Sequence, residues 1–216
     1  MKHGTLDYTT SKHTALMIVD LQNDFCPGGA LAVPGGDEIL AAANALLEFM
    51  PVSVLTQDWH PAGHVSFASS TGRKPYTLDE SKDPPAVLWP DHCVAGSKGA
   101  DFHPALRTEF ARLILRKGTR RELDSYSAFF ENDGITSTGL AAWLSALGIT
   151  SLVLLGLATD YCVKATALDA RSLGFGVDLV DEGMRGVEAA PGDTKNAIET
   201  MKAAGCRLLA LKEILR

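Results

Sequence analysis

Six runs of consecutive apolar residues recur along this 216-residue chain, and segments of helical periodicity separate several of them. Strands that are apolar at every position are typical of a parallel sheet covered on both faces, whereas a half-exposed strand alternates. The runs predict strands at residues 15–19, 52–56, 111–115, 151–155, 176–180 and 207–210. The helical segments between them are 37–49, 138–147, 161–173 and 193–204.

Capping residues support these helices. Asp37 and Asp160 suit N-caps, and Gly148 and Gly205 suit C-terminal ends. The alternation of strand and helix over the whole length predicts an α/β fold: three α/β/α layers around a six-stranded, mainly parallel, Rossmann-like sheet. We expect one domain that spans residues 1–216.

Residues 60–104 interrupt this pattern. The stretch has little periodicity and is rich in Pro, Gly and Ser, and a loop of this length inside a compact domain is usually functional or disordered. Two Trp-linked histidine clusters within it favour a functional loop that binds a metal or covers a site.

The charge pattern narrows the range of partners. The net charge is −6 and the basic residues are scattered, so we expect neither nucleic acid nor a membrane surface as a partner. No apolar stretch is long enough to cross a bilayer, and the first fifteen residues lack the pattern of a signal peptide. Four cysteines without a CxxC pair fit a reducing compartment, which predicts a cytoplasmic protein.

Polar side chains stand at the ends of four predicted strands. Asp20, Asp58, Lys117 and Cys162 each end or follow one strand, and the carboxyl ends of parallel strands share one edge of a sheet. At that edge Asp20 can act as a general base, and Lys117 can lower the pKa of a thiol and hold the carboxylate. Taken singly, an Asp at a strand end is commonly a cap, and a Lys-Gly pair is commonly a turn.

Cys162 is the candidate nucleophile. It is predicted in the first turn of the helix after the fourth strand, where unpaired amides and the helix dipole favour a thiolate. The same amides can hold the oxyanion of an acyl-transfer intermediate. The alternative is a small apolar filler, because free cysteines are often simply buried. Cys26, Cys93 and Cys206 are interpreted as structural.

A second group of side chains suits a metal. Asp58 and His60 point to the same side of an extended chain, and His92 can complete one face of a coordination shell. A carboxylate with imidazoles suits zinc, iron or manganese. An isolated DxH sequence is usually only polar surface. His64 is left open as a fourth ligand or a supporting residue.

Aromatic side chains lie in loops beside these motifs. Phe25, Trp89 and Tyr126 can sandwich a planar ring, although packing in the core or in a lid explains each of them as well.

Together these segments resemble the isochorismatase-like cysteine hydrolase superfamily, and within it the nicotinamidases. The similarity extends from about residue 15 to about residue 210. It is carried by IVDLQNDF (18–25), QDWHP (57–61), WPDHC (89–93), RKG (116–118), DSYSAF (124–129) and GLATDYCV (156–163).

The resemblance implies roles for individual residues. It makes Asp20, Lys117 and Cys162 a catalytic triad, and it implies a cis peptide before Ala158, with the amides of Ala158 and Cys162 as the oxyanion hole. It further implies that Asp58, His60 and His92 bind one divalent ion, usually zinc or iron, and that Phe25, Trp89 and Tyr126 form the ring-binding cage.

The implied reaction converts nicotinamide and water to nicotinate and ammonia through a cysteine thioester, in NAD salvage. Some members of the family assemble, so a homo-oligomer is one of the states open to this chain. Three alternatives remain: an amidase of the same superfamily for carbamoyl or ureido substrates, a hydrolase in which metal-bound water attacks directly, and an inactive binding module.

Overall fold

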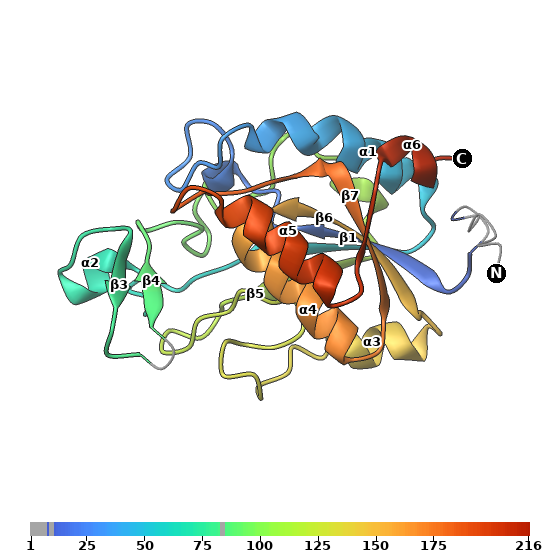
Figure 1. The fold of residues 1–216 in the computed structure, drawn as a ribbon. Helices are drawn as coiled ribbons and strands as arrows, with labels where there is room; N and C mark the ends of the chain where they lie inside the picture. Colours follow the sequence, from blue (N-terminus) through green and yellow to red (C-terminus); the bar gives the residue numbers. More distant parts are fainter. Residues whose placement is uncertain (1–7, 9–10, 83–84) are drawn as a thin grey trace.

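A computed structural model describes residues 8, 11–82 and 85–216 of the chain. Its centre is a six-stranded sheet of order β5-β2-β1-β6-β7-β8, and every pairing within that sheet is parallel (Figure 1). The expected α/β fold is confirmed. The strands are β1 (Thr14–Val19), β2 (Ser53–Asp58), β5 (Leu113–Lys117), β6 (Ser151–Leu157), β7 (Gly176–Arg185) and β8 (Arg207–Leu209).

Helices cover both faces of the sheet, as the continuous apolar strands require. Leu16 and Ile18 of β1 pack with α1 (Leu40–Phe49) and α6 (Leu211–Ile214) in one apolar cluster. The intervening residues of β1 pack in a second apolar cluster on the other face. That face carries the helices α3 (Leu140–Ala146), α4 (Lys164–Ser172) and α5 (Asp193–Ala203).

The predicted caps are half right. Gly148 and Gly205 follow α3 and α5 with φ of 71° and 90°, a conformation that favours glycine at a helix end. Asp37 is not a cap, because it lies inside a 3-10 turn, η2 (Gly36–Ile39), whose N-cap is Gly35. Asp160 is not a cap either: it lies inside the helical turn η4 (Thr159–Val163), and its carboxylate binds another segment.

The region 60–104 holds more regular structure than its sequence indicates. It contains α2 (Ala68–Thr71) and an antiparallel pair, β3 (Thr77–Asp79) and β4 (Ala86–Leu88), which project from one end of the sheet (Figure 1). Two short 3-10 turns, η1 (Asn23–Phe25) and η3 (Thr108–Phe110), complete the elements. Figure 1 shows that the hairpin lies toward the carboxyl ends of β1 and β2, so this region borders the site described below.

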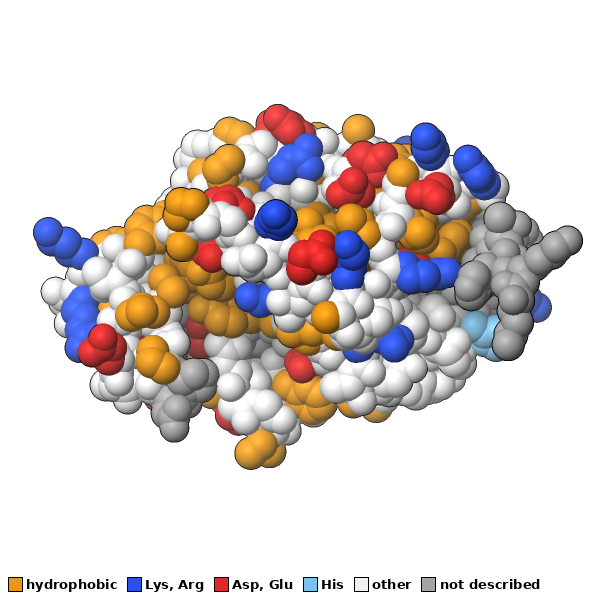
Figure 2. Space-filling view, in the orientation of Figure 1, with side chains coloured by type: hydrophobic (Ala, Val, Ile, Leu, Met, Phe, Trp, Pro, Cys, Tyr) orange, Lys and Arg blue, Asp and Glu red, His pale blue; other side chains and the backbone are white. Residues whose placement is uncertain are grey.

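The surface mixes charges of both signs. On the face shown in Figure 2, acidic and basic side chains are interspersed, so that face offers no continuous basic surface. Among the described residues, no helix has the length and hydropathy needed to cross a membrane.

Candidate active site

The carboxyl edge of the sheet gathers the four predicted polar residues. Asp20 follows β1, Asp58 ends β2, Lys117 ends β5, and Cys162 lies in η4 directly after β6. Side-chain atoms of Asp20, Asp58 and Cys162 lie within 4.8 Å of one another, and all three residues are buried. The prediction that the topology brings these groups together is confirmed.

Lys117 joins the group. Its Nζ lies 2.9 Å from Asp20 Oδ2, 2.5 Å from Asp58 Oδ1 and 3.4 Å from Cys162 Sγ. It also donates to the carbonyl of Ser125 at 3.2 Å. Burial disfavours the ammonium, but the two carboxylates outweigh that effect and raise the pKa of Lys117 well above its ordinary value. The lysine is therefore a fixed cation in contact with the thiol.

Asp20 has the environment of a general base. Burial raises the pKa of Asp20 to about 6, although the attraction of Lys117 opposes the rise. The hydroxyl of Thr56 donates to Oδ1 at 2.6 Å, which fixes the carboxylate. A base of this pKa is ionised at neutral pH and still binds a proton readily.

The surroundings of Cys162 have opposing effects on the pKa of its thiol. Burial raises the pKa of Cys162 well above its ordinary value, and the opposing effect of Lys117 is too small to reverse it. Burial therefore works against the expected thiolate and Lys117 works for it, so the thiolate stays a prediction.

The turn that carries Cys162 differs from the expected first turn of an α-helix. η4 is a single π-helical turn, with Tyr161 and Val163 both donating their N–H to the carbonyl of Ala158 at 3.1 Å, and α4 begins only after it. The peptide bond between Leu157 and Ala158 is cis, as the resemblance implies. π-turns are frequent at functional sites, and this one places Ala158 and Cys162 on the wall of one pocket.

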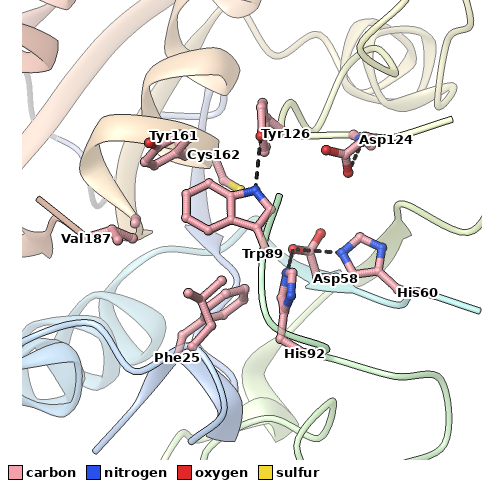
Figure 3. Close-up of a pocket in the computed structure, with 13 residues that line it drawn as sticks. Phe25, Asp58, His60, Trp89, His92, Asp124, Tyr126, Tyr161, Cys162 and Val187 are labelled. Atoms are coloured by element: carbon pink, nitrogen blue, oxygen red, sulfur yellow. Dashed lines mark hydrogen bonds and ion pairs between the residues drawn. The ribbon is translucent and has the colours of Figure 1, made fainter. Parts of the chain in front are cut away.

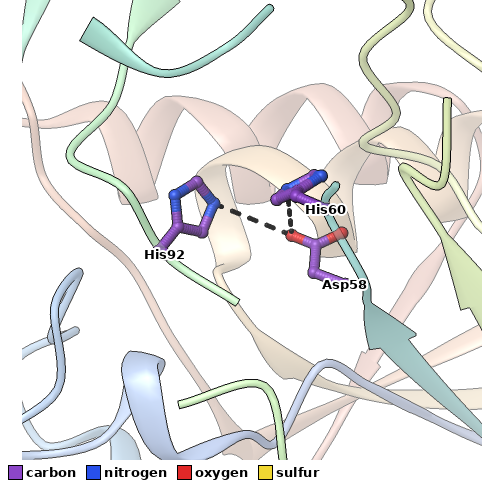
Figure 4. A group of neighbouring side chains, drawn as sticks. All are labelled: Asp58, His60 and His92. Carbon is purple, nitrogen blue, oxygen red and sulfur yellow. Dashed lines mark ion pairs between the residues drawn. The ribbon is translucent and has the colours of Figure 1, made fainter. Parts of the chain in front are cut away.

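The three predicted metal-binding residues form a second group (Figure 4). The Nε2 atoms of His60 and His92 lie 3.5 and 4.0 Å from Asp58 Oδ2. The Nδ1–H of His60 donates to Gly118 O at 3.0 Å, and that of His92 donates to Pro90 O at 2.8 Å. Each ring therefore turns the lone pair of its Nε2 toward the carboxylate, which is the tautomer that a metal ligand needs.

The pKa shifts of the two imidazoles differ. Burial disfavours the imidazolium of His60, but Asp58 outweighs burial and raises the pKa of His60. Burial lowers the pKa of His92 to about 4, so the imidazole is neutral at physiological pH. Burial also disfavours ionisation of Asp58, but Lys117 and His60 outweigh it and hold the pKa of Asp58 well below its ordinary range. One ionised carboxylate between inward-facing imidazoles fits a divalent ion.

His64 stands behind His60. The two rings are stacked with centroids 4.1 Å apart. His64 Nε2 donates to Leu123 O at 3.3 Å, and its Nδ1 accepts from the Ser66 hydroxyl at 2.7 Å. Both ring nitrogens of His64 have protein partners, and this arrangement favours a supporting role.

A glycine makes room for the metal group. Gly118, with φ of 62°, approaches the His60 ring so closely that an added Cβ would clash with it. This steric requirement explains why a glycine follows Lys117.

Phe25, Trp89 and Tyr126, the predicted aromatic residues, line the same pocket as Cys162 (Figure 3). The indole Nε1 of Trp89 donates to the Tyr126 hydroxyl at 3.2 Å. The cavity, about 30 Å³, is nearly filled by its own side chains. Further lining residues that sequence reasoning missed are Leu31, Asp124, Tyr161 and Val187.

Gln22 was also missed. Its side chain is fully buried and binds both backbone groups of Asp58: Nε2 donates to Asp58 O, and Oε1 accepts from Asp58 N, each at 2.8 Å. It ties the loop after β1 to the end of β2. The signal was present, because a polar residue two positions after Asp20 in an apolar context has to find buried partners.

The arrangement supports one kind of chemistry especially well. A thiol, a carboxylate and a fixed cation meet beside a narrow aromatic pocket, and the candidate metal ligands Asp58, His60 and His92 line the same pocket (Figure 3). Such a set suits attack of sulfur on a carbonyl carbon attached to a flat ring.

Known proteins place the chain in a family. Residues 14–213 match the isochorismatase domain, so the chain belongs to the isochorismatase family. The nicotinamidase of Escherichia coli (strain K12) is 47% identical over 203 residues, which cover 92% of this chain and 95% of that protein. The resemblance to nicotinamidases that the motifs indicated is confirmed.

Solved structures agree. An Acinetobacter baumanii nicotinamidase and pyrazinamidase superposes with a TM-score of 0.92 at 41% identity, over 95% of this chain and all of that one. PnC1 from L. infantum in complex with nicotinate superposes with a TM-score of 0.83 at 38% identity, over 96% of this chain and 98% of that one. A zinc complex of the pyrazinamidase of Pyrococcus horikoshii superposes with a TM-score of 0.74 at 36% identity, over 92% of this chain and 99% of that one.

Proposed function

We propose that this protein hydrolyses nicotinamide to nicotinate and ammonia through a thioester on Cys162. The observation that carries the proposal is the contact of Lys117 with Asp20 and with the thiol, because it unites base, cation and nucleophile at the wall of an aromatic pocket. The nicotinamidase relative and the nicotinate complex support the choice of substrate.

Asp20 and Cys162 carry the first half of the reaction. Asp20 takes the thiol proton as sulfur bonds to the carboxamide carbon, and the backbone N–H groups of Ala158 and Cys162 bind the resulting oxyanion. Collapse of this intermediate breaks the C–N bond, and the proton on Asp20 passes to the departing ammonia. Lys117 stays charged throughout and balances the carboxylates.

Water completes the cycle. Asp20, again a carboxylate, accepts a proton from the water that attacks the thioester carbon. The C–S bond breaks, and the proton on Asp20 passes to sulfur. The acid product gives the second proton of the water to solvent and leaves as nicotinate. Each half of the cycle uses the same base, which is why a carboxyl with a pKa of about 6 is suitable.

Asp58, His60 and His92 are the proposed ligands of one divalent ion, and His64 supports His60. We propose zinc, with iron or manganese also compatible with this donor set, and the zinc complex of the Pyrococcus horikoshii pyrazinamidase supports that choice. When bound, the ion supplies Lewis acidity that can hold the ring nitrogen and polarise water.

The ring cage is assigned to Phe25, Trp89 and Tyr126, which present flat faces or edges to the pocket. Their contact with a pyridine ring excludes water from the reacting carbon and orients the carboxamide toward sulfur.

The central test is ammonia release from nicotinamide by metal-loaded protein, compared with pyrazinamide, acetamide and a ureido substrate. We expect hydrolysis of nicotinamide by the native protein and none by Cys162→Ala. Preference for the ureido substrate would favour the carbamoyl amidase alternative. Near-native turnover by Cys162→Ala, together with loss on chelation, would instead favour direct attack by metal-bound water.

We also propose a cytoplasmic place in NAD salvage. The four cysteines are free and buried, which suits a reducing compartment. Expression of the chain in cells that lack nicotinamidase should restore growth on nicotinamide as the pyridine source.

A further inference from the structure

We propose that Asp160 is a positioning residue that sets the width of the ring pocket by holding Val187. The inference rests on the proposed function, because it concerns how a flat amide substrate is gripped. Asp160 touches neither the thiol nor the metal group in the contacts described above, so its effect has to pass through the segment that it binds.

The Asp160 carboxylate is committed to one segment. The residue is 2% exposed, and its two oxygens accept the N–H of Val187 at 3.0 Å and of Glu188 at 2.8 Å. None of the ion pairs within the described residues includes Asp160. A buried carboxylate without a cation depends on such hydrogen bonds, so the two contacts are strong constraints.

Val187 forms part of the pocket wall. It lies in the connection between β7 and α5 and lines the cavity together with Tyr161 and Cys162. Figure 3 places Val187 beside Tyr161 and Phe25, across the pocket from Asp58 and His60. A shift of Val187 therefore changes the space for a ring without touching the metal group.

The connection itself needs to be held. Glu188 has a φ of 54°, a left-handed conformation that costs energy for a residue with a side chain. Gly186 packs against Thr194 and Asp160 so tightly that an added Cβ would clash with Thr194. Since the backbone on both sides of Val187 is constrained, the side chain has little freedom while Asp160 keeps its two hydrogen bonds.

One turn carries both the nucleophile and this anchor. Asp160 and Cys162 lie two positions apart in η4, so the distance from the sulfur to the Val187 wall is set within a single turn. The contact of the pocket wall with the ring and the position of the attacking sulfur therefore depend on the same turn. Loosening the anchor should weaken substrate binding more than it slows the chemical step.

Glu188 provides a matched control in the same segment. Its carboxylate accepts two backbone N–H groups as well, from Gly192 at 2.9 Å and Thr194 at 2.7 Å, but these lie at the start of α5 and do not line the pocket. Glu188→Ala thus removes two hydrogen bonds from the same connection, one more than Asp160→Asn, and leaves the anchor on Val187 intact.

The test compares Asp160→Asn, Val187→Ala, the double variant and Glu188→Ala in the metal-loaded protein. Asparagine keeps the volume, but its amide nitrogen cannot accept a backbone N–H. We expect KM to rise about tenfold for Asp160→Asn, the size of effect that one lost buried hydrogen bond gives, with kcat within about threefold of the native value. Val187→Ala should behave alike, and the double variant should show little further change.

Two results would overturn the inference. If Glu188→Ala raises KM as much as Asp160→Asn, the role of Asp160 is only structural. If the effects of Asp160→Asn and Val187→Ala are additive, Asp160 does not act through Val187. Failure of the native protein to hydrolyse nicotinamide would reject the proposed function separately, and the same comparison would then use the best substrate of the panel.

Discussion

Two side-chain groups at the carboxyl edge of the sheet, one around Lys117 and one around His60 and His92, share Asp58. They differ in whether a cation is already present in the group. Around Lys117 the carboxylates of Asp20 and Asp58 share one ammonium inside the protein, which lies 2.9 and 2.5 Å from their oxygens. Around His60 and His92 the rings supply lone pairs, and only the second oxygen of Asp58 brings charge. The first group is complete as folded, whereas the second is built to receive a cation.

Asp58 thus connects two independent tasks. Its Oδ1 binds Lys117, and its Oδ2 faces the imidazoles. A change on the Lys117 side should therefore affect catalysis or folding, and a change on the histidine side should affect metal affinity. Variants that alter only one of the two properties test this separation.

Asp20→Asn should give the largest effect. Without a base the thiol keeps its proton, and we expect kcat/KM to fall by about 10³-fold or more while the metal content stays the same. Steady-state kinetics and elemental analysis measure the two quantities. Asp178→Asn is a suitable control, because Asp178 is a buried aspartate paired with Arg207 away from the pocket. Loss of metal from Asp20→Asn would break the proposed separation.

Lys117→Met should have the second largest effect, and we expect that effect on folding stability. It leaves two buried carboxylates without their cation, and we expect a loss of about 3 kcal/mol in the free energy of unfolding at pH 8. In this variant the pKa values of Asp20 and Asp58 in the folded state rise above their values in the unfolded chain. The folded state then binds protons more tightly, so the free energy of unfolding is higher at low pH and falls as the pH rises. Denaturation at pH 5 and pH 8 measures this, and an equal deficit at both would contradict the account.

The pH profile of the native enzyme should show a smaller effect. Burial raises the pKa of Asp20 to about 6, and only the ionised form can accept the thiol proton. We therefore expect kcat/KM to be level above this value and to fall about tenfold per unit below it. A profile that stays flat down to pH 5 would show that Asp20 is not the base.

Sequence reasoning was most successful where function follows topology. Asp20, Lys117 and Cys162 were predicted to converge because each follows a parallel strand, and parallel strands end at the same edge. It failed where long-range pairing decides. Nothing local indicates that Asp160 binds residues 187 and 188 instead of capping its helix, or that Val187 reaches the pocket. The rise in the pKa of Cys162 on burial was not predicted, because burial is a property of the whole fold.

We expect the smallest effect for a change of His64, which tests how the histidine side of the site holds a metal. The ring stacks on His60 and anchors to Ser66 and Leu123, so it limits the motion of a proposed ligand. His64→Ala should weaken metal retention about tenfold, the usual scale for a residue that orients a ligand. The fall of kcat/KM at low pH should stay at the same pH in the metal-loaded variant. Competition with a chelator measures retention, and His13→Ala, a change of an exposed histidine bonded to Gly148 O, is the control. If His64→Ala instead abolishes binding, His64 is itself a ligand, and the metal group extends beyond Asp58, His60 and His92.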